Sequence, residues 1–139
     1  MKYLRKLLTQ KAEVIQAQPI TLDNSEPEPD VAIVRLPETL YRSRHPYPQD
    51  VYWLIEISNR TLQKDLKQKA IVYARNGIPE YWVIDIAKQK LIVHTNPQRD
   101  LSYAKGINYY IKVAEHQTGS ITPLAFPNIS IPLSELLLY

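Results

Sequence analysis

The stretch DVYWLIEISNRTLQKDLKQKAIVYARNGIPEYWVID, residues 50–85, decides the fold of this chain. It holds two apolar runs, residues 50–58 and 80–86, on either side of a segment with helical periodicity at residues 62–76. Thr61 is a good N-cap for that helix, and a glycine and a proline follow its end. The stretch therefore predicts a strand, a helix and a second strand.

The first of these strands carries an acidic side chain, Glu56, where burial is expected. Strict alternation assigns the strand's residues to two faces, with Tyr52, Leu54 and Glu56 on one and Val51, Trp53, Ile55 and Ile57 on the other. Glu56 thus lies in a strand that is apolar on both faces, as central strands are. A carboxylate in such surroundings needs a compensating partner.

The helix carries a matching basic residue, Lys69. Leu62, Leu66 and Tyr73 form an apolar stripe at positions i, i+4 and i+11, and Lys69 falls within it. Its ammonium is therefore expected near Glu56. Two other interpretations stay open, a helix-surface pair of Lys69 with Asp65 at i, i+4 and a buried ion pair with Glu56 that is only structural. Two further lysines, Lys64 and Lys67, are expected on the opposite side of the helix.

Composition limits the classes of protein that fit. A chain of 139 residues with 45% hydrophobic side chains suits one domain, residues 1–139, with a real core. A net charge of +3 permits a nucleic-acid partner without requiring one. The absence of cysteine excludes disulfides and thiolate zinc sites, which favours hard ions such as Mg2+ or Mn2+ for any metal site. No run approaches the length of a membrane span, so a cytoplasmic protein is expected.

The rest of the chain predicts further strands around this unit. A short basic helix with Leu4, Leu7 and Leu8 on one side should dock on the sheet, and the tail should pack Leu133, Leu136 and Leu137. Strands are predicted at residues 12–22, 29–35, 90–95 and 109–114, with a proline-rich loop at residues 36–49. The order of elements predicts a small α/β (α+β) domain rather than a doubly wound one.

Four segments together resemble a known family. EPEPDVAIV, LIEIS, DLKQKAIVYARNGIPEYWVID and YRSRHPYP closely resemble the Uma-type restriction endonucleases, a family of the PD-(D/E)XK nuclease superfamily. The resemblance covers the chain from about residue 12. It implies a restriction-endonuclease-like core, a mixed β-sheet flanked by helices in the order αβββαβ, with added C-terminal strands. It also implies a metal-dependent endonuclease that hydrolyses phosphodiester bonds in DNA.

The resemblance assigns roles to three residues. Asp30 and Glu56 would bind Mg2+ or Mn2+, which would polarise a phosphodiester and lower the pKa of its water. Lys69 would be the third catalytic residue. The superfamily usually places this lysine two residues after the acidic residue, where Ser58 stands here, and members of this type supply it from the following helix. On the residues alone, Asp30 could instead only cap its strand after a proline turn.

DNA is the expected partner, with Arg42, Arg44 and Arg60 as the phosphate contacts beside the two carboxylates. A homodimer is also compatible with the chain. Relatives typically carry a further strand and helix with another acidic residue, so the chain is expected to be N-terminally short relative to the family. The alternative function is accordingly a catalytically inactive nuclease-fold protein that binds nucleic acid or associates with itself.

Other polar and aromatic residues are expected to be structural. The histidines, at positions 45, 94 and 116, have no ligand spacing. Asp85 suits a turn, and the cluster of Trp53, Trp82 and Tyr81 suits the core better than a platform for stacking bases.

Overall fold

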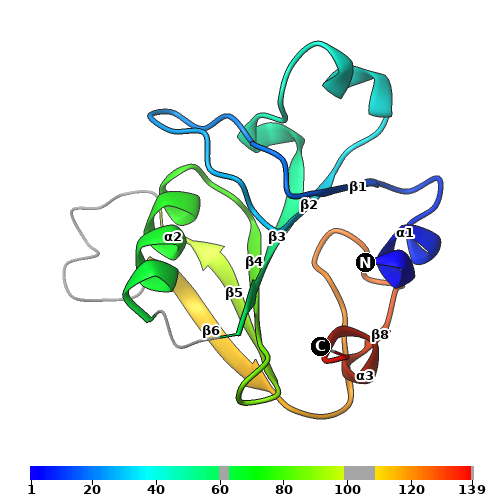
Figure 1. The fold of residues 1–139 in the computed structure, drawn as a ribbon, viewed down its shortest axis with the longest axis vertical. Helices are drawn as coiled ribbons and strands as arrows, with labels where there is room; N and C mark the ends of the chain where they lie inside the picture. The colour runs from blue at the N-terminus through cyan, green and yellow to red at the C-terminus, as the bar shows by residue number, and fades with distance from the viewer. Residues whose placement is uncertain (60–62, 99–108, 139) are drawn as a thin grey trace.

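The computed structural model describes residues 1–59, 63–98 and 109–138, with the side chains of residues 63–65 outside the description. A six-stranded sheet runs through the centre, with its strands in the order of the chain (Figure 1). The strands are β1 (Glu13–Gln16), β2 (Val31–Val34), β3 (Val51–Ser58), β4 (Glu80–Asp85), β5 (Lys90–Pro97) and β6 (Tyr110–His116). Among the neighbouring strand pairs that the structure describes, β3–β4 is parallel and the others are antiparallel, so the sheet is mixed.

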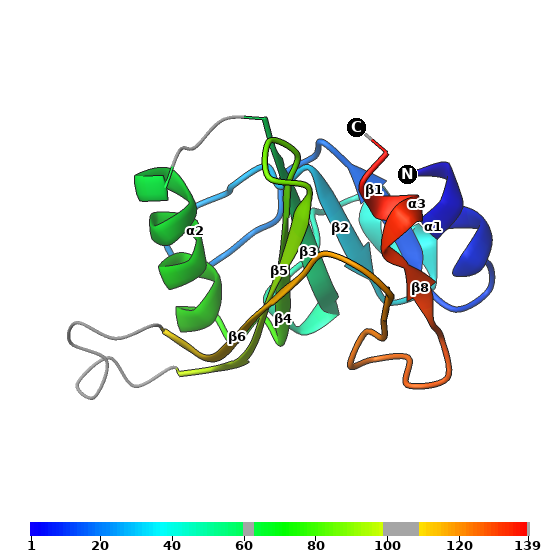
Figure 2. The same cartoon turned by 90° about the horizontal axis from the view of Figure 1, so that it is seen from below.

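The helices lie on both faces of this sheet. The helices are α1 (Lys2–Leu7), α2 (Gln63–Arg75) and α3 (Leu133–Leu136), with 3-10 turns η1 (Glu38–Arg42) and η2 (Pro48–Asp50). A small second sheet pairs β7 (Ser120–Ile121) with β8 (Ile131–Pro132). Figure 2 shows α2 on one face of the large sheet and α1, α3 and the tail on the other. The mixed sheet and the order αβββαβ with added C-terminal strands confirm the predicted fold class.

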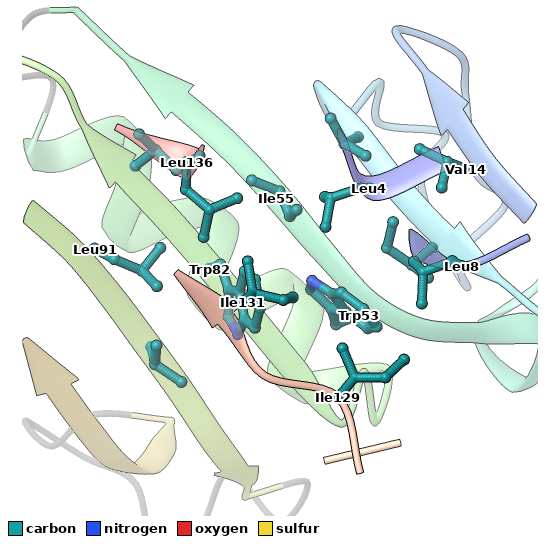
Figure 3. Close-up of a cluster of buried hydrophobic side chains, with 14 of the residues drawn as sticks. Leu4, Leu8, Val14, Trp53, Ile55, Trp82, Leu91, Ile129, Ile131 and Leu136 are labelled. Atoms are coloured by element: carbon teal, nitrogen blue, oxygen red, sulfur yellow. The ribbon is translucent and has the colours of Figure 1, made fainter. Parts of the chain in front are cut away.

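Two hydrophobic clusters fill the two faces. On the α1–α3 face, Trp53 and Trp82 lie with ring centroids 5.1 Å apart, and Ile131 and Leu136 come from the tail (Figure 3). On the α2 face, Tyr81 packs with residues that include Leu54 and Tyr73. The two tryptophans and Tyr81 are therefore core residues, as predicted, but not one cluster, because alternation sends Tyr81 and Trp82 to opposite faces.

A β-bulge in β3 overturns part of the predicted alternation. Ile33 pairs with Trp53 whereas Val34 pairs with Val51, so Tyr52 is the extra residue. Tyr52 consequently lies on the face of Trp53, where its ring contacts Phe126 at 5.1 Å. Val51 lies on the opposite face, in the cluster that α2 covers. The predicted faces are wrong for Val51 and Tyr52 because the register of the partner strand decides them.

Some element boundaries differ from the predictions and others agree with them. The strand predicted at residues 12–22 ends at Gln16, because Ala17 adopts a left-handed φ of +50°. The predicted loop at residues 36–49 contains the two 3-10 turns. At the end of α2, Gly77 has φ of +72°, which confirms its place after the helix. The predicted N-cap, Thr61, lies outside the described residues.

The ends of the chain pack as predicted. Leu4 and Leu8 are fully buried beside β1, and Leu133 and Leu136 are buried in the tail. Within the described ranges, no helix is long and apolar enough to cross a membrane.

Candidate functional site

Antiparallel pairing of β2 with β3 brings Asp30 to Glu56. Val31 lies opposite Ile55 in this antiparallel pair. Asp30, the residue before Val31, is therefore brought beside Glu56, the residue after Ile55. The main-chain N–H of Asp30 donates to Oε1 of Glu56 at 3.1 Å. In return, the N–H of Ile57 donates to Oδ2 of Asp30 at 2.6 Å. Each carboxylate is therefore held by the backbone of the other strand.

The helix α2 supplies two further donors to Glu56 from above the sheet. Nζ of Lys69 lies 3.0 Å from Oε2 of Glu56, and the hydroxyl of Tyr73 donates to the same oxygen at 3.1 Å. Lys69 and Tyr73 are one helical turn apart and so share a face of the helix. Glu56 and Tyr73 are buried, whereas the Lys69 side chain keeps 36% of its surface exposed. The Lys69 side chain is thus partly exposed while its ammonium contacts the buried carboxylate.

The predicted proximity of Lys69 to Glu56 is therefore confirmed, while the catalytic role of Lys69 stays a prediction. Among the competing lysines, Lys67 is exposed, as expected for the opposite side of the helix. The side chains of Lys64 and Asp65 lie outside the described residues. Tyr73 was predicted only as a member of the apolar stripe, and its hydroxyl was missed. The signal that reveals it is the i, i+4 spacing from Lys69.

Burial dominates the electrostatics of this group. Burial raises the pKa of Glu56 above its ordinary value of 4.5. The Lys69 ammonium and the Asp30 N–H lower this pKa, but by less than burial raises it. The neighbouring charge of Asp30 raises this pKa as well. Burial, followed by the charge of Glu56, raises the pKa of Tyr73 far above that of a free tyrosine. Tyr73 therefore remains a protonated donor throughout the physiological pH range.

The oxygens of Asp30 and Glu56 fit a divalent cation of the magnesium type. Mg2+ prefers carboxylate oxygens, commonly takes only one or two from the protein and keeps several waters. Oδ1 of Asp30 receives no hydrogen bond within the described part of the chain, and Oε1 of Glu56 receives one there. Among the side chains that the structure describes, no group of three or more His, Cys, Asp or Glu is placed to hold a metal ion. The candidate donor set among them is therefore the pair of carboxylates.

Asp85 and His94 have structural contacts. Oδ1 of Asp85 accepts the N–H of Lys88 in the turn between β4 and β5, as predicted. Nδ1 of His94 lies 3.0 Å from the carbonyl oxygen of Tyr81, and burial lowers the pKa of this imidazole. The contacts of both residues are thus with their own turn or a neighbouring strand.

Two of the three arginines predicted to contact phosphate can be located in the structure. Nη1 of Arg44 lies 2.7 Å from Oδ2 of buried Asp50. Asp50 directly precedes β3, so it is separated from Glu56 by about 20 Å along the strand. The ion pair with Asp50 places Arg44 toward the other end of β3 from the two carboxylates, and its role as a phosphate contact stays a prediction. Arg42 is exposed at the end of η1 in the same loop, and Arg60 lies outside the described residues.

Comparison with known proteins finds a family and a solved structure to which the chain is similar. A family model named Uma2 and described as "Putative restriction endonuclease" matches residues 1–134. Among solved structures, the chain is similar to a crystal structure described as "a putative nuclease belonging to DUF820" from Anabaena variabilis. The TM-score is 0.69 at 12% identity, over 99% of this chain and 75% of that chain, so this likeness shows the fold alone. None of the curated proteins compared with the chain matches it.

Proposed function

We propose that this chain, which belongs to the Uma2 family described as "Putative restriction endonuclease", is a metal-dependent endonuclease that hydrolyses phosphodiester bonds in DNA. The observation that carries the proposal is the convergence of Asp30, Glu56 and Lys69. Two carboxylates joined by backbone hydrogen bonds and one partly exposed ammonium lie at one place on the sheet. This combination of charges suits a phosphodiester and a divalent cation.

Asp30 and Glu56 would hold Mg2+ or Mn2+. When bound, the ion would supply Lewis-acid polarisation of the phosphodiester and activation of a water molecule. The protein's own part is to hold both carboxylates in place. The Lys69 ammonium and the N–H groups of Asp30 and Ile57 would perform this task, because each contacts a carboxylate oxygen.

Lys69 would stabilise the negative charge that develops on the phosphate. Its partly exposed side chain allows contact with a substrate in solvent, while its stem is anchored on α2. A preorganised charge of this kind is worth about 3–4 kcal/mol of activation free energy when it acts in a site sheltered from water. We further propose that Arg42, Arg44 and Arg60 contact DNA phosphates, which they would bind without reading sequence.

A second candidate is a catalytically inactive nuclease-fold protein that binds nucleic acid or forms a homodimer. The observation that favours it is the small donor set, since the described residues bring only two carboxylates together. Under this proposal the Glu56–Lys69 contact would be a structural ion pair.

Nicking of supercoiled plasmid in the presence of Mg2+ separates the two candidates. The nuclease proposal expects nicking that a chelator abolishes and that Lys69→Met reduces by about 10²–10³-fold. The matched control is Lys67→Met, which removes the same charge from an exposed position on the same helix and should leave nicking unchanged. Equal nicking by the two variants, or none by the unmodified chain, would reject the nuclease.

A further inference from the structure

We infer that Tyr73 is a positioning residue for Glu56, holding one carboxylate oxygen in place while Lys69 contacts the substrate. This inference rests on the proposed function and adds a residue to it. Its basis is that Tyr73 and Lys69 both reach Oε2 of Glu56, at 3.1 and 3.0 Å, from successive turns of α2. The helix thus presents two donors of different mobility to a single oxygen.

The hydroxyl of Tyr73 is not needed for packing. The Tyr73 ring is fully buried and meets the Tyr81 ring edge-on, with centroids 5.0 Å apart and an interplanar angle of 72°. A phenylalanine ring would make the same contact. Because a buried hydroxyl is costly without a partner, its presence is best explained by the bond to Glu56.

The two donors to Oε2 differ in their freedom to move. Lys69 has a long flexible side chain that is 36% exposed, so its ammonium can turn toward a phosphate. Tyr73 is enclosed by the core and cannot follow it. When Lys69 engages the substrate, Tyr73 remains as the donor to Oε2 from this helix, and the N–H of Asp30 remains on Oε1. The carboxylate therefore keeps its orientation while the ammonium moves.

The test is to measure Mn2+ affinity by calorimetry, together with kcat and KM for plasmid nicking, in Tyr73→Phe. The matched control is Tyr110→Phe, because Tyr110 is equally buried in the same cluster but donates its hydroxyl to the carbonyl oxygen of Ile78 at 2.8 Å. We expect Tyr73→Phe to weaken Mn2+ binding by about 10–100-fold, as loss of a group that orients a metal ligand commonly does. Its kcat should fall with little change in KM, and Tyr110→Phe should retain the affinity of the unmodified chain.

The outcomes separate this inference from the proposed function. Equal Mn2+ affinity in Tyr73→Phe and Tyr110→Phe would overturn the role of Tyr73 and leave the nuclease proposal standing. An unmodified chain that binds no Mn2+ would overturn both. A chain that binds Mn2+ without cleaving DNA would reject the nuclease, while the affinity difference between the two variants would still decide the role of Tyr73.

A double-mutant cycle gives a second test that does not depend on a single variant. Because Tyr73 and Lys69 act on the same oxygen, Tyr73→Phe should weaken Mn2+ binding more in a Lys69→Met background than in the unmodified chain. Additive effects of the two substitutions on Mn2+ affinity would contradict the inference that Tyr73 and Lys69 jointly fix Oε2 of Glu56.

Discussion

Glu56 and Glu80 are buried glutamates on adjacent parallel strands, yet their surroundings differ in kind. Glu56 receives an ammonium and lies beside a second carboxylate, that of Asp30. Glu80 accepts the indole N–H of Trp82 at 2.8 Å and the N–H of Leu124 at 2.9 Å, and it has no ion pair within the described part of the chain. Burial is the first cause that raises the pKa of both groups.

The contrast shows that burial alone does not identify a functional carboxylate. Glu80 ties the loop at Leu124 to the start of β4 with neutral donors, which is a structural task. Glu56 has in addition a cationic partner that reaches solvent, and a carboxylate neighbour. These two features support the assignment of chemistry to Glu56.

The largest expected difference is between Glu56→Ala and Glu80→Ala. Glu56→Ala should abolish Mn2+ binding and nicking, because it removes half of the donor set. Glu80→Ala should retain Mn2+ binding but lower the free energy of unfolding by about 2–4 kcal/mol, since it creates a cavity and leaves the buried Trp82 N–H without an acceptor. Calorimetry and urea unfolding measure the two effects. Loss of Mn2+ binding in both variants would contradict the distinction between a functional Glu56 and a structural Glu80.

The pH dependence of stability gives a smaller difference, which Glu80→Gln isolates. Because folding raises the pKa of Glu80 above 4.5, the unfolded chain loses its proton first, and the contribution of this group to stability falls as pH rises from 4.5 through the folded pKa. The unmodified chain should therefore lose stability relative to Glu80→Gln over this window, by at most about 1.4 kcal/mol per pH unit. Urea unfolding at several pH values measures the slope.

Glu80→Gln also replaces one acceptor oxygen by an NH2 group, so either the Trp82 or the Leu124 N–H faces another donor, but that cost does not vary with pH. The slope of the difference between the two proteins, not its size at one pH, is therefore the informative quantity. Parallel stability curves would show that Glu80 does not titrate differently in the folded chain.

The smallest effect concerns Arg42 and Arg44, in the loop between β2 and β3. If Arg42 contacts phosphate, Arg42→Gln should reduce the salt slope of DNA binding by about one unit and leave stability unchanged, because the side chain is exposed. Arg44→Gln provides the comparison, since it breaks the ion pair with buried Asp50 and should lower stability. DNA affinity at several salt concentrations measures the slope, and an affinity insensitive to salt would contradict DNA binding itself.

The central unit of the fold could be predicted because its signals are local. Helical periodicity, Gly77 after the helix and two apolar runs define β3, α2 and β4 without knowledge of the rest of the chain. The convergence of Glu56 with Lys69 follows from the same patterns, since one is polar on an apolar strand and the other is polar on an apolar helix face.

The features that escaped prediction depend on distant partners. The bulge at Tyr52 arises from the register of β3 against β2, and the position of Arg44 depends on Asp50. The role of the Tyr73 hydroxyl becomes visible only once Oε2 of Glu56 is located under α2. Patterns within one segment contain no information on such pairings.

The bulge at Tyr52 also limits how this chain can change in length. Pairing of residues 31–33 with residues 53–55 holds Asp30 beside Glu56 whatever the path of the intervening loop, so insertions between η1 and η2 should leave the carboxylates together. Deletion of a single residue within residues 53–55 is different, because with the bulge kept it would shift Glu56 by one place and turn it away from α2. Deletion of Tyr52 itself could be absorbed by straightening the strand. The chain thus contains one position in β3 at which evolution or design can remove a residue without dismantling the site.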